Sequence, residues 1–303
     1  MTVCEGEGDI ARDAISSLLG DAPPASIDAF VIDDASKSRV GKALVDHCAS
    51  LGVTAELKVL PDPLGFRGCV SRLITGLAWI AEPGRPPYDF VVKLDPDALF
   101  LRPDFLRFIA RHCSPRGIWG MVGPMRKRDR VLLLADLFPA GFRRKTTGTL
   151  IQRAWEPRRF RPVWWADIGR RALLNGFRFR YANGSMYALG GDTLRALAGR
   201  GYLQRRVAGR HGFITSEEDL MATLLTFAAG HGLTDLNQIS PAWGEPHAGP
   251  HTDPQRLLAA GTYLLHPLKA NPAGSELRRR FMHALEHARQ AQSRSPLSAP
   301  TPG

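Results

Sequence analysis

Two aspartates that follow an apolar run are the strongest chemical signal in this sequence. Residues 89–100 read Asp-Phe-Val-Val-Lys-Leu-Asp-Pro-Asp-Ala-Leu-Phe, so Asp95 and Asp97 stand where a buried strand would end. In open α/β sheets, ligands bind beyond the carboxyl ends of strands. Two carboxylates at this spacing can share Mg²⁺ or Mn²⁺, which then bridges to the phosphate oxygens of a nucleoside diphosphate. The alternative is a solvated turn after the strand.

A second apolar run ends in acidic residues in the segment Phe-Val-Ile-Asp-Asp-Ala-Ser, residues 30–36. Asp33 and Asp34 could hydrogen-bond a ribose or a base edge. The alternative is that they cap the helix that follows, because Asp and Ser are common residues at helix N-caps.

A third acidic group, Glu218 and Asp219, opens an apolar helical pattern. A carboxylate at this position could act as the general base that deprotonates an attacking hydroxyl. The same residues would also be favoured by the helix dipole alone, so capping is the alternative.

His266 follows the apolar residues Tyr-Leu-Leu near the end of the chain. Neutral imidazole is a common metal ligand, so His266 could complete a site begun by Asp95 and Asp97. The alternative is a purely structural histidine.

The charge of the chain is concentrated in its middle. The 303 residues carry a formal net charge of +11, and residues 101–210 hold 24 basic and 6 acidic residues. This surplus indicates an anionic partner, such as a nucleotide, an acidic glycan, a lipid surface or nucleic acid.

The composition excludes a disordered or collagen-like chain. No apolar run is long enough to span a membrane, and the acidic first residues do not resemble a secretory signal. The four cysteines form no CxxC pair, which favours a reduced, cytoplasmic protein.

Helix-like and strand-like runs alternate along the chain, which predicts an α/β fold with a mainly parallel sheet. The expected strands are 29–32, 55–60, 90–94 and 185–189, and the expected helices are 9–19, 40–51, 68–82, 103–113, 191–198 and 217–230. The segment of roughly 124–180 is less regular, since it is basic, aromatic and broken by prolines. The composition of residues 288–303 predicts a disordered tail.

Together these segments resemble nucleotide-sugar-dependent glycosyltransferases of the GT-A fold. A helix containing Trp79, the Lys93–Asp97 motif, the block 181–189 and the Glu218–Asp219 pair are similar to the beta-1,3-galactosyltransferase and Fringe type. The first third is equally similar to bacterial family-two-like glycosyltransferases. The resemblance implies a mixed, mostly parallel central sheet flanked by helices. It also implies one domain over 1–287, with a nucleotide-binding half (28–123), a basic aromatic insertion (124–180) and an acceptor half (181–287).

The resemblance implies a role for each candidate residue. Asp95, Asp97 and His266 would hold Mn²⁺ or Mg²⁺, and Asp219 or Glu218 would be the catalytic base of an inverting transfer. The donor side would be formed by Asp33, Asp34, Arg72 and Lys93. The family commonly uses UDP-sugars. A glycan or lipid-linked acceptor, with peripheral contact to an anionic membrane, would account for tryptophans among the arginines of 152–181. One departure is Pro96, which stands where the family has a third acidic residue.

Two other classes of protein remain as alternatives. A sugar nucleotidyltransferase would begin with a glycine-rich loop that contains a basic residue, and residues 1–9 contain Gly6 and Gly8 among acidic residues instead. A nucleic-acid-binding or anionic-polymer-binding protein would use the basic segment 101–210. That class gives no role to carboxylates at strand ends, so nucleic acid is not the favoured partner.

Overall fold

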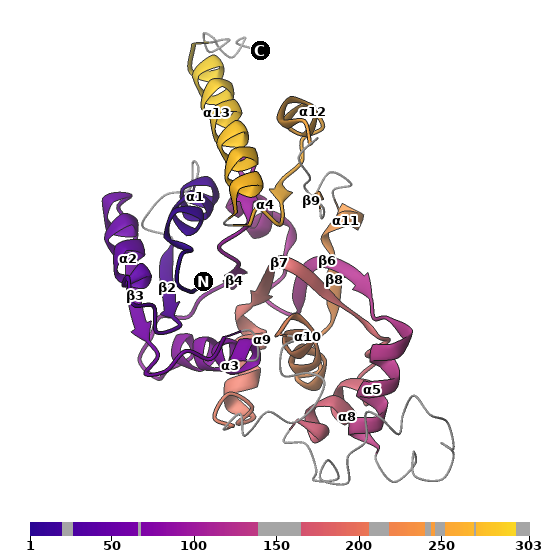
Figure 1. Cartoon of the computed structure of the whole chain (residues 1–303). Helices are drawn as coiled ribbons and strands as arrows, with labels where there is room; N and C mark the ends of the chain where they lie inside the picture. The colour runs from indigo at the N-terminus through magenta and orange to yellow at the C-terminus, as the bar shows by residue number, and fades with distance from the viewer. Residues whose placement is uncertain are drawn as a thin grey trace, which may run out of the picture.

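The structure is a computed structural model, and it describes residues 1–19, 27–65, 68–138, 165–205, 218–239, 244–245, 252–269 and 271–294. Within these ranges the strands form three sheets with helices on their faces (Figure 1). Four of the seven strand pairs described are parallel. The α/β class that the sequence predicts is therefore confirmed.

The first sheet contains three parallel strands in the order β1-β2-β3. These strands are β1 (Thr2–Val3), β2 (Asp28–Asp33) and β3 (Thr54–Val59). Helices α1 (Gly8–Leu19) and α2 (Val40–Ser50) bury their apolar residues against it. The short apolar run at β2 is typical of a strand that is covered by helices.

The second sheet is mixed and has the order β4-β7-β6-β8. Its strands are β4 (Phe90–Leu94), β7 (Arg180–Gly190), β6 (Ile118–Pro124) and β8 (Leu233–Asp235). Successive residues of β7 belong to different core clusters: Tyr187 and Leu189 pack in one, Met186 and Ala188 in the other. This alternation is expected for a strand covered on both faces, because successive side chains point to opposite sides.

Helices cover both faces of this second sheet. One face packs against helices that include α3 (Cys69–Ile80), α8 (Ala166–Leu174), α9 (Gly191–Gly199) and α10 (Glu218–Ala228). The other face packs against α4 (Phe105–His112), and α5 (Lys127–Leu137) packs beside α8.

A third, small sheet brings the end of the chain back to its middle. Strand β10 (Leu264–Leu265) pairs with β5 (Leu99–Phe100) and with β9 (Gly244–Glu245). Two further helices are α11 (Leu236–Ile239) and α12 (Pro254–Ala259), and the last is α13 (Pro272–Arg294). None of the helices described is both long and apolar enough to cross a membrane.

Arg278 attaches helix α13 to the rest of the molecule. Its buried guanidinium donates to the carbonyl oxygens of Ile10, Ala98 and Leu268 at 3.3, 3.5 and 3.4 Å. Because these carbonyls belong to three separate segments, one side chain fixes the segment after β10 against the segment after β4. The residues that follow these two strands are thereby held close together.

Two expectations from the sequence need correction. Within the described part of the less regular segment 124–180, the chain forms helices α5 and α8, which the sequence pattern did not indicate. The apolar residues 131–135 of α5 are consecutive, so they show no helical period. Helix α13 also continues to Arg294, so residues 288–294 of the expected tail are helical. Alanine, arginine and glutamine are good helix formers, and this outweighs their low hydrophobicity.

Gly41 permits the close approach of α2 to β2 and β3. A Cβ atom there would lie 2.6 Å from Leu57 Cδ1 and 2.8 Å from Asp33 Cβ. We expect Gly41→Ala to lower the free energy of unfolding by about 1–3 kcal/mol, measured by urea denaturation, although Ala is normally the better helix former. Gly199→Ala in α9 is the control, since its Cβ would meet nothing within 4 Å. If both variants were equally stable, α2 could not lie this close to the sheet.

Candidate functional site

The two aspartates and the histidine singled out in the sequence meet at the ends of two strands. Asp95 and Asp97 follow β4, and His266 follows β10. The backbone N–H of Leu268 donates to the carbonyl oxygen of Asp97 at 2.9 Å, which joins the two segments. One ligand atom from each of the three side chains lies within 4.8 Å of the others. His266 Nε2 is 3.2 Å from Asp97 Oδ1.

Asp97 lies in a strongly electropositive environment. Burial alone would raise the pKa of its carboxyl group, but His266 and the ammonium of Lys269 outweigh burial and hold the pKa well below its usual range. Lys269 forms an ion pair with Oδ2, so each carboxylate oxygen of Asp97 faces a basic side chain. An ionised carboxylate beside an imidazole and a second carboxylate is a donor set that suits Mn²⁺ or Mg²⁺.

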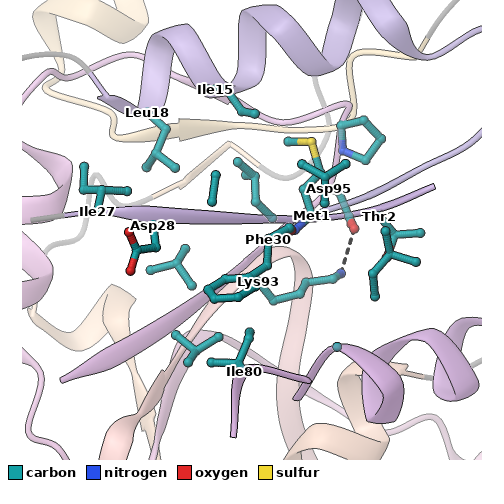
Figure 2. Close-up of a pocket in the computed structure, with 18 of the residues that line it drawn as sticks. Met1, Thr2, Ile15, Leu18, Ile27, Asp28, Phe30, Ile80, Lys93 and Asp95 are labelled. Carbon is teal, nitrogen blue, oxygen red and sulfur yellow. Dashed lines mark hydrogen bonds and ion pairs between the residues drawn. The ribbon is translucent and has the colours of Figure 1, made fainter. Parts of the chain in front are cut away.

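A second cluster of charges surrounds Lys93 on β4. Its ammonium lies 2.8 Å from Asp95 Oδ1, 2.7 Å from Glu218 Oε1 and 3.4 Å from Asp219 Oδ1. Burial opposes the charge on Lys93, but the three carboxylates outweigh it and raise the pKa of Lys93 well above its usual value. Burial also raises the pKa of Asp95, and Lys93 offsets only part of this. The pair Lys93–Asp95 is drawn in Figure 2.

The structure therefore brings six of the nine candidate residues together. They are Lys93, Asp95, Asp97, Glu218, Asp219 and His266. Asp95 belongs to both clusters, because it contacts Lys93 on one side and lies beside Asp97 and His266 on the other. The first turn of α10 therefore lies beside the carboxyl end of β4. This is where side chains that act on one ligand are expected in an open α/β sheet.

Asp33 makes its contacts with its own chain. Its carboxylate accepts from the N–H and Oγ of Ser36 at 2.7 and 2.8 Å, and from the N–H of Gly41 at 2.8 Å. Ser36 Oγ in turn accepts from the N–H of Val40. These bonds hold the start of α2, although the N-cap position itself is occupied by Arg39. With three donors already bound, Asp33 holds this turn and is not among the residues that line the cavity at Asp95.

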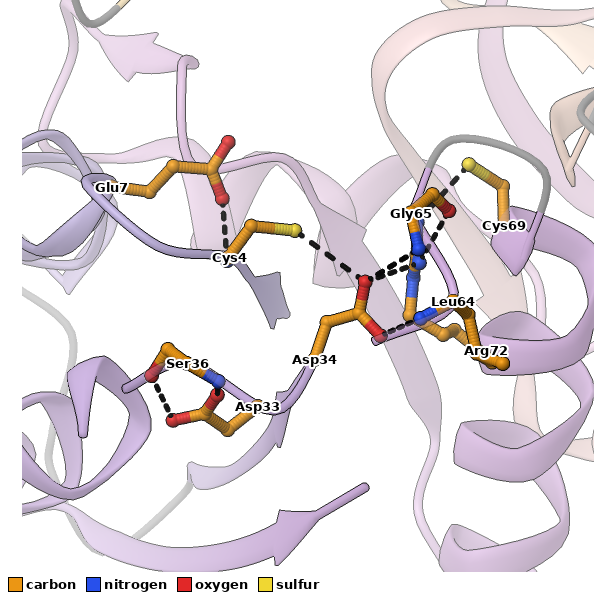
Figure 3. Close-up of polar contacts among 9 residues, drawn as sticks. All are labelled: Cys4, Glu7, Asp33, Asp34, Ser36, Leu64, Gly65, Cys69 and Arg72. Carbon is orange, nitrogen blue, oxygen red and sulfur yellow. Dashed lines mark hydrogen bonds and ion pairs between the residues drawn. The ribbon is translucent and has the colours of Figure 1, made fainter. Parts of the chain in front are cut away.

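Asp34 and Arg72 form a buried ion pair in which Arg72 Nη1 lies 2.9 Å from Asp34 Oδ2. The N–H groups of Leu64 and Gly65 also donate to Asp34, and the carbonyl of Gly65 accepts from Arg72 (Figure 3). Arg72 also lines the same cavity as Asp95 and Asp97. The pair therefore fixes the segment after β3 at the edge of the site.

Three residues at the site were not among the sequence candidates. Lys269 could have been suspected from its position three residues after His266. Glu7 lines the cavity after β1, where burial raises its pKa and the nearby Asp97 adds to the rise. The Tyr187 hydroxyl is buried without a hydrogen bond in the described chain, and Lys93 lies 5.8 Å from its ring centre. Tyr187 belongs to the block 181–189 of the sequence resemblance, but only strand register places it opposite Lys93.

The aromatic segment 152–181 lies only partly within the described residues. Trp155, Phe160 and Trp164 are outside them. Trp165 and Phe177 are almost fully buried in the main core cluster. These two rings pack in the core, so they are not available as a platform for sugars or lipids.

Comparisons with known proteins were made for sequence and for structure. No family model matches the sequence, and no curated protein matches it either. Three similar solved structures are all glycosyltransferases, which is the class that the sequence resembles. WbbM, a bifunctional glycosyltransferase in its apo form, has a TM-score of 0.45 and 13% identity over 93% of this chain and 51% of that chain. This chain thus spans about half the length of WbbM.

The other two structures are smaller. The mannosyltransferase PcManGT from Pyrobaculum calidifontis, in complex with GDP-Man and Mn²⁺, has a TM-score of 0.42 and 16% identity over 99% of this chain and 81% of that chain. Mouse xyloside xylosyltransferase 1, in its apo form, has a TM-score of 0.34 and 12% identity over 88% of this chain and 95% of that chain.

The central position of Lys93 can be tested by removing its charge. Lys93→Met leaves three carboxylates facing one another, and we expect the free energy of unfolding at pH 7 to fall by about 3 kcal/mol. The repulsion raises the folded-state pKa values of these acids above their unfolded values. The folded state then binds more protons, so the variant should regain stability as the pH falls from 7 towards 4, measured by urea denaturation.

The matched control is Lys42→Met, which removes an exposed lysine that pairs with Asp46 on the surface of α2. It should change stability by less than about 1 kcal/mol at either pH. A Lys93→Met variant as stable as this control would show that the three carboxylates do not depend on Lys93.

Proposed function

We propose that this protein is a metal-dependent glycosyltransferase that moves a sugar from a nucleoside diphosphate to a hydroxyl group. The observation that carries the proposal is that two clusters of charged side chains meet at Asp95. There, a group of potential metal ligands (Asp95, Asp97 and His266) adjoins a pair of carboxylates at a helix start (Glu218 and Asp219). Transfer of a sugar needs both a place for the diphosphate and a base for the attacking hydroxyl, and these clusters would supply them.

Asp95, Asp97 and His266 would hold Mn²⁺ or Mg²⁺, which neutralises charge on the leaving diphosphate when bound. The chain adds positive charge of its own at this end of the site. Lys269 is the more exposed of the two lysines, since its side chain is 63% exposed whereas that of Lys93 is 16% exposed. Lys269 is therefore the one that an incoming phosphate would meet first.

Asp219 is the proposed catalytic base, because Glu218 makes the shorter contact with Lys93. Asp219 would take the proton of the acceptor hydroxyl while the oxygen of that hydroxyl bonds to the anomeric carbon of the donor. The bond between that carbon and the diphosphate oxygen breaks, and the nucleoside diphosphate leaves with the electron pair. A single attack of this kind inverts the anomeric centre. The transition state has oxocarbenium character, as it does in glycoside hydrolysis.

The finer specificity rests on the resemblance found in the sequence. UDP is the expected nucleotide, and the two segments held by Asp33 and by the Asp34–Arg72 pair would lie at its nucleoside. The expected acceptor is a hydroxyl of a glycan or of a lipid-linked sugar. The basic segment 101–210 would bring a lipid-linked acceptor to the site by contact with an anionic membrane surface.

Donor binding can be tested by thermal unfolding with a panel of nucleoside diphosphates, with and without Mn²⁺. A ligand at a hundredfold excess over its Kd stabilises the folded state by about 2.7 kcal/mol. We expect UDP with Mn²⁺ to raise Tm by about 5 °C, and Asp97→Asn to remove this shift. Asp46→Asn on the exposed face of α2 is the control and should keep it. The absence of a shift with every nucleotide would contradict the proposal.

The identity of the base can be tested by comparing two isosteric variants. Asp219→Asn should lower kcat by a factor of about 10²–10⁴ while donor binding, measured by the same thermal shift, is retained. Glu218→Gln should have the smaller effect on kcat. Assays would follow release of the nucleoside diphosphate from a UDP-sugar in the presence of a glycan acceptor. If Glu218→Gln gave the larger loss, the two roles would be exchanged.

A further inference from the structure

Strand β7 continues past the end of β4 into the region of the candidate site. Its residue Met186 pairs with Leu94, which is the last residue of β4. Because this pairing is antiparallel, the part of β7 that precedes Met186 extends past the carboxyl end of β4, from which Asp95 and Asp97 follow. This extension of β7 gives the site a strand to which other elements can be attached.

The pairing of β7 with β6 is irregular in the same extension. Gly120 pairs with Tyr187 and Val122 pairs with Ala182, so Met121 alone spans the gap on β6 and residues 183–186 span it on β7. A bulge of this kind bends a strand and changes the direction of the groups beside it. Ala182 is fully buried, so its backbone N–H needs an acceptor within the protein.

The hydroxyl of Thr223 on α10 supplies that acceptor. Thr223 Oγ1 accepts from the N–H of Ala182 at 3.2 Å and donates to the carbonyl oxygen of Asp219 at 2.9 Å. The side chain of Thr223 is itself fully buried, so both bonds are made in the protein interior. One hydroxyl group thus links the bulge of β7 to the backbone of Asp219.

A second buried threonine on the same helix provides a comparison. Thr226 Oγ1 donates to the carbonyl oxygen of Ala222 at 2.9 Å, one turn earlier in the helix. A bond of this kind is common for threonine in helices. Within the described residues, no hydrogen bond joins the Thr226 hydroxyl to a strand. The bond from Ala182 therefore distinguishes Thr223 from a threonine that bonds only to its own helix.

The backbone of Asp219 is held by a contact that does not depend on the charge of its side chain. The carboxylate of Asp219 lies 3.4 Å from the ammonium of Lys93, which lies closer to Glu218 and Asp95. A carboxylate that takes a proton loses its charge, so its attraction to Lys93 weakens. The link through Thr223 joins backbone groups to a hydroxyl, and it is the same before and after that proton moves.

We propose that Thr223 is a positioning residue for the transfer reaction, because it ties the first turn of α10 to β7 and so fixes where the carboxylate of Asp219 lies. This inference rests on the proposed function, in which Asp219 is the base. A base must lie within about 3 Å of the hydroxyl that it deprotonates, and a displacement of about 1 Å can lower a rate about 100-fold. Thr223 therefore acts on kcat through Asp219.

The experiment compares variants in which a buried hydroxyl is lost or kept. Thr223→Val keeps the shape of the side chain and removes both hydrogen bonds. We expect it to lower kcat about 10- to 100-fold, while KM for the UDP-sugar and the thermal shift with UDP and Mn²⁺ stay within about twofold of wild type. Thr223→Ser keeps the hydroxyl and should have a kcat within about threefold of wild type.

The matched control is Thr226→Val, which removes a buried hydroxyl and its bond to Ala222 from the same helix. It should leave kcat within about threefold of wild type. Thr223→Ala and Thr223→Ser form a second pair, which serves if Thr223→Val does not fold. Both lack the methyl group and they differ only in the hydroxyl, so kcat should be at least about tenfold lower in Thr223→Ala.

Amide hydrogen exchange tests the bond to the strand without any substrate. The N–H of Ala182 should exchange at least about tenfold faster in Thr223→Ala than in Thr223→Ser or in Thr226→Val. Because this measurement needs no turnover, it gives its answer whether or not the protein transfers a sugar.

Two results would overturn the inference. The first is equal exchange of the Ala182 amide in Thr223→Ala and Thr223→Ser, which would mean that the hydroxyl does not hold the strand. The second is a wild-type protein that transfers sugar while Thr223→Val and Thr226→Val have equal kcat values. Failure of the proposed function is distinguishable from both, because the wild-type protein would then transfer no sugar although the amide exchange still followed the hydroxyl.

Discussion

The site depends on one buried ammonium, that of Lys93. Three carboxylates from β4 and α10 converge on this group, and without a cation their mutual repulsion would oppose the packing of α10 against the sheet. His266 and Lys269 likewise contact the carboxylate of Asp97 and stabilise its charge. The chain thus offsets part of the charge of these acidic groups with its own basic residues, and Asp95 is the acid common to both clusters.

Buried polar contacts hold the segments around these charged groups in place. Asp33 fixes the start of α2, the Asp34–Arg72 pair fixes the segment after β3, and Arg278 fixes the segment after β10. In each case a buried charged group bonds to backbone groups of another segment, and the carbonyls that Arg278 contacts come from distant parts of the chain. Such contacts are costly to leave unmade, so they specify one arrangement of the segments around the site.

The parts predicted from the sequence were those with strong local signals. The apolar periods of 40–51 and 90–94 gave elements within one or two residues of α2 and β4, and acids at strand ends identified Asp95 and Asp97. Long-range pairing could not be predicted. The position of Tyr187 follows from strand register, and the place of Lys269 beside Asp97 follows from the pairing of β10 with β5. For Asp33, capping and ligand binding require the same residue types, so only the contacts distinguish them.

The pairing of β10 with β5 also has a consequence for how the molecule forms. His266 lies 169 positions after Asp97 in the sequence, yet the two side chains touch. Contacts between such distant positions form late, because closing the intervening loop costs entropy that only later packing returns. During synthesis, Asp95 and Asp97 therefore emerge long before the residues that balance them. The three side chains Asp95, Asp97 and His266 come together only when the last third of the chain has folded onto the first.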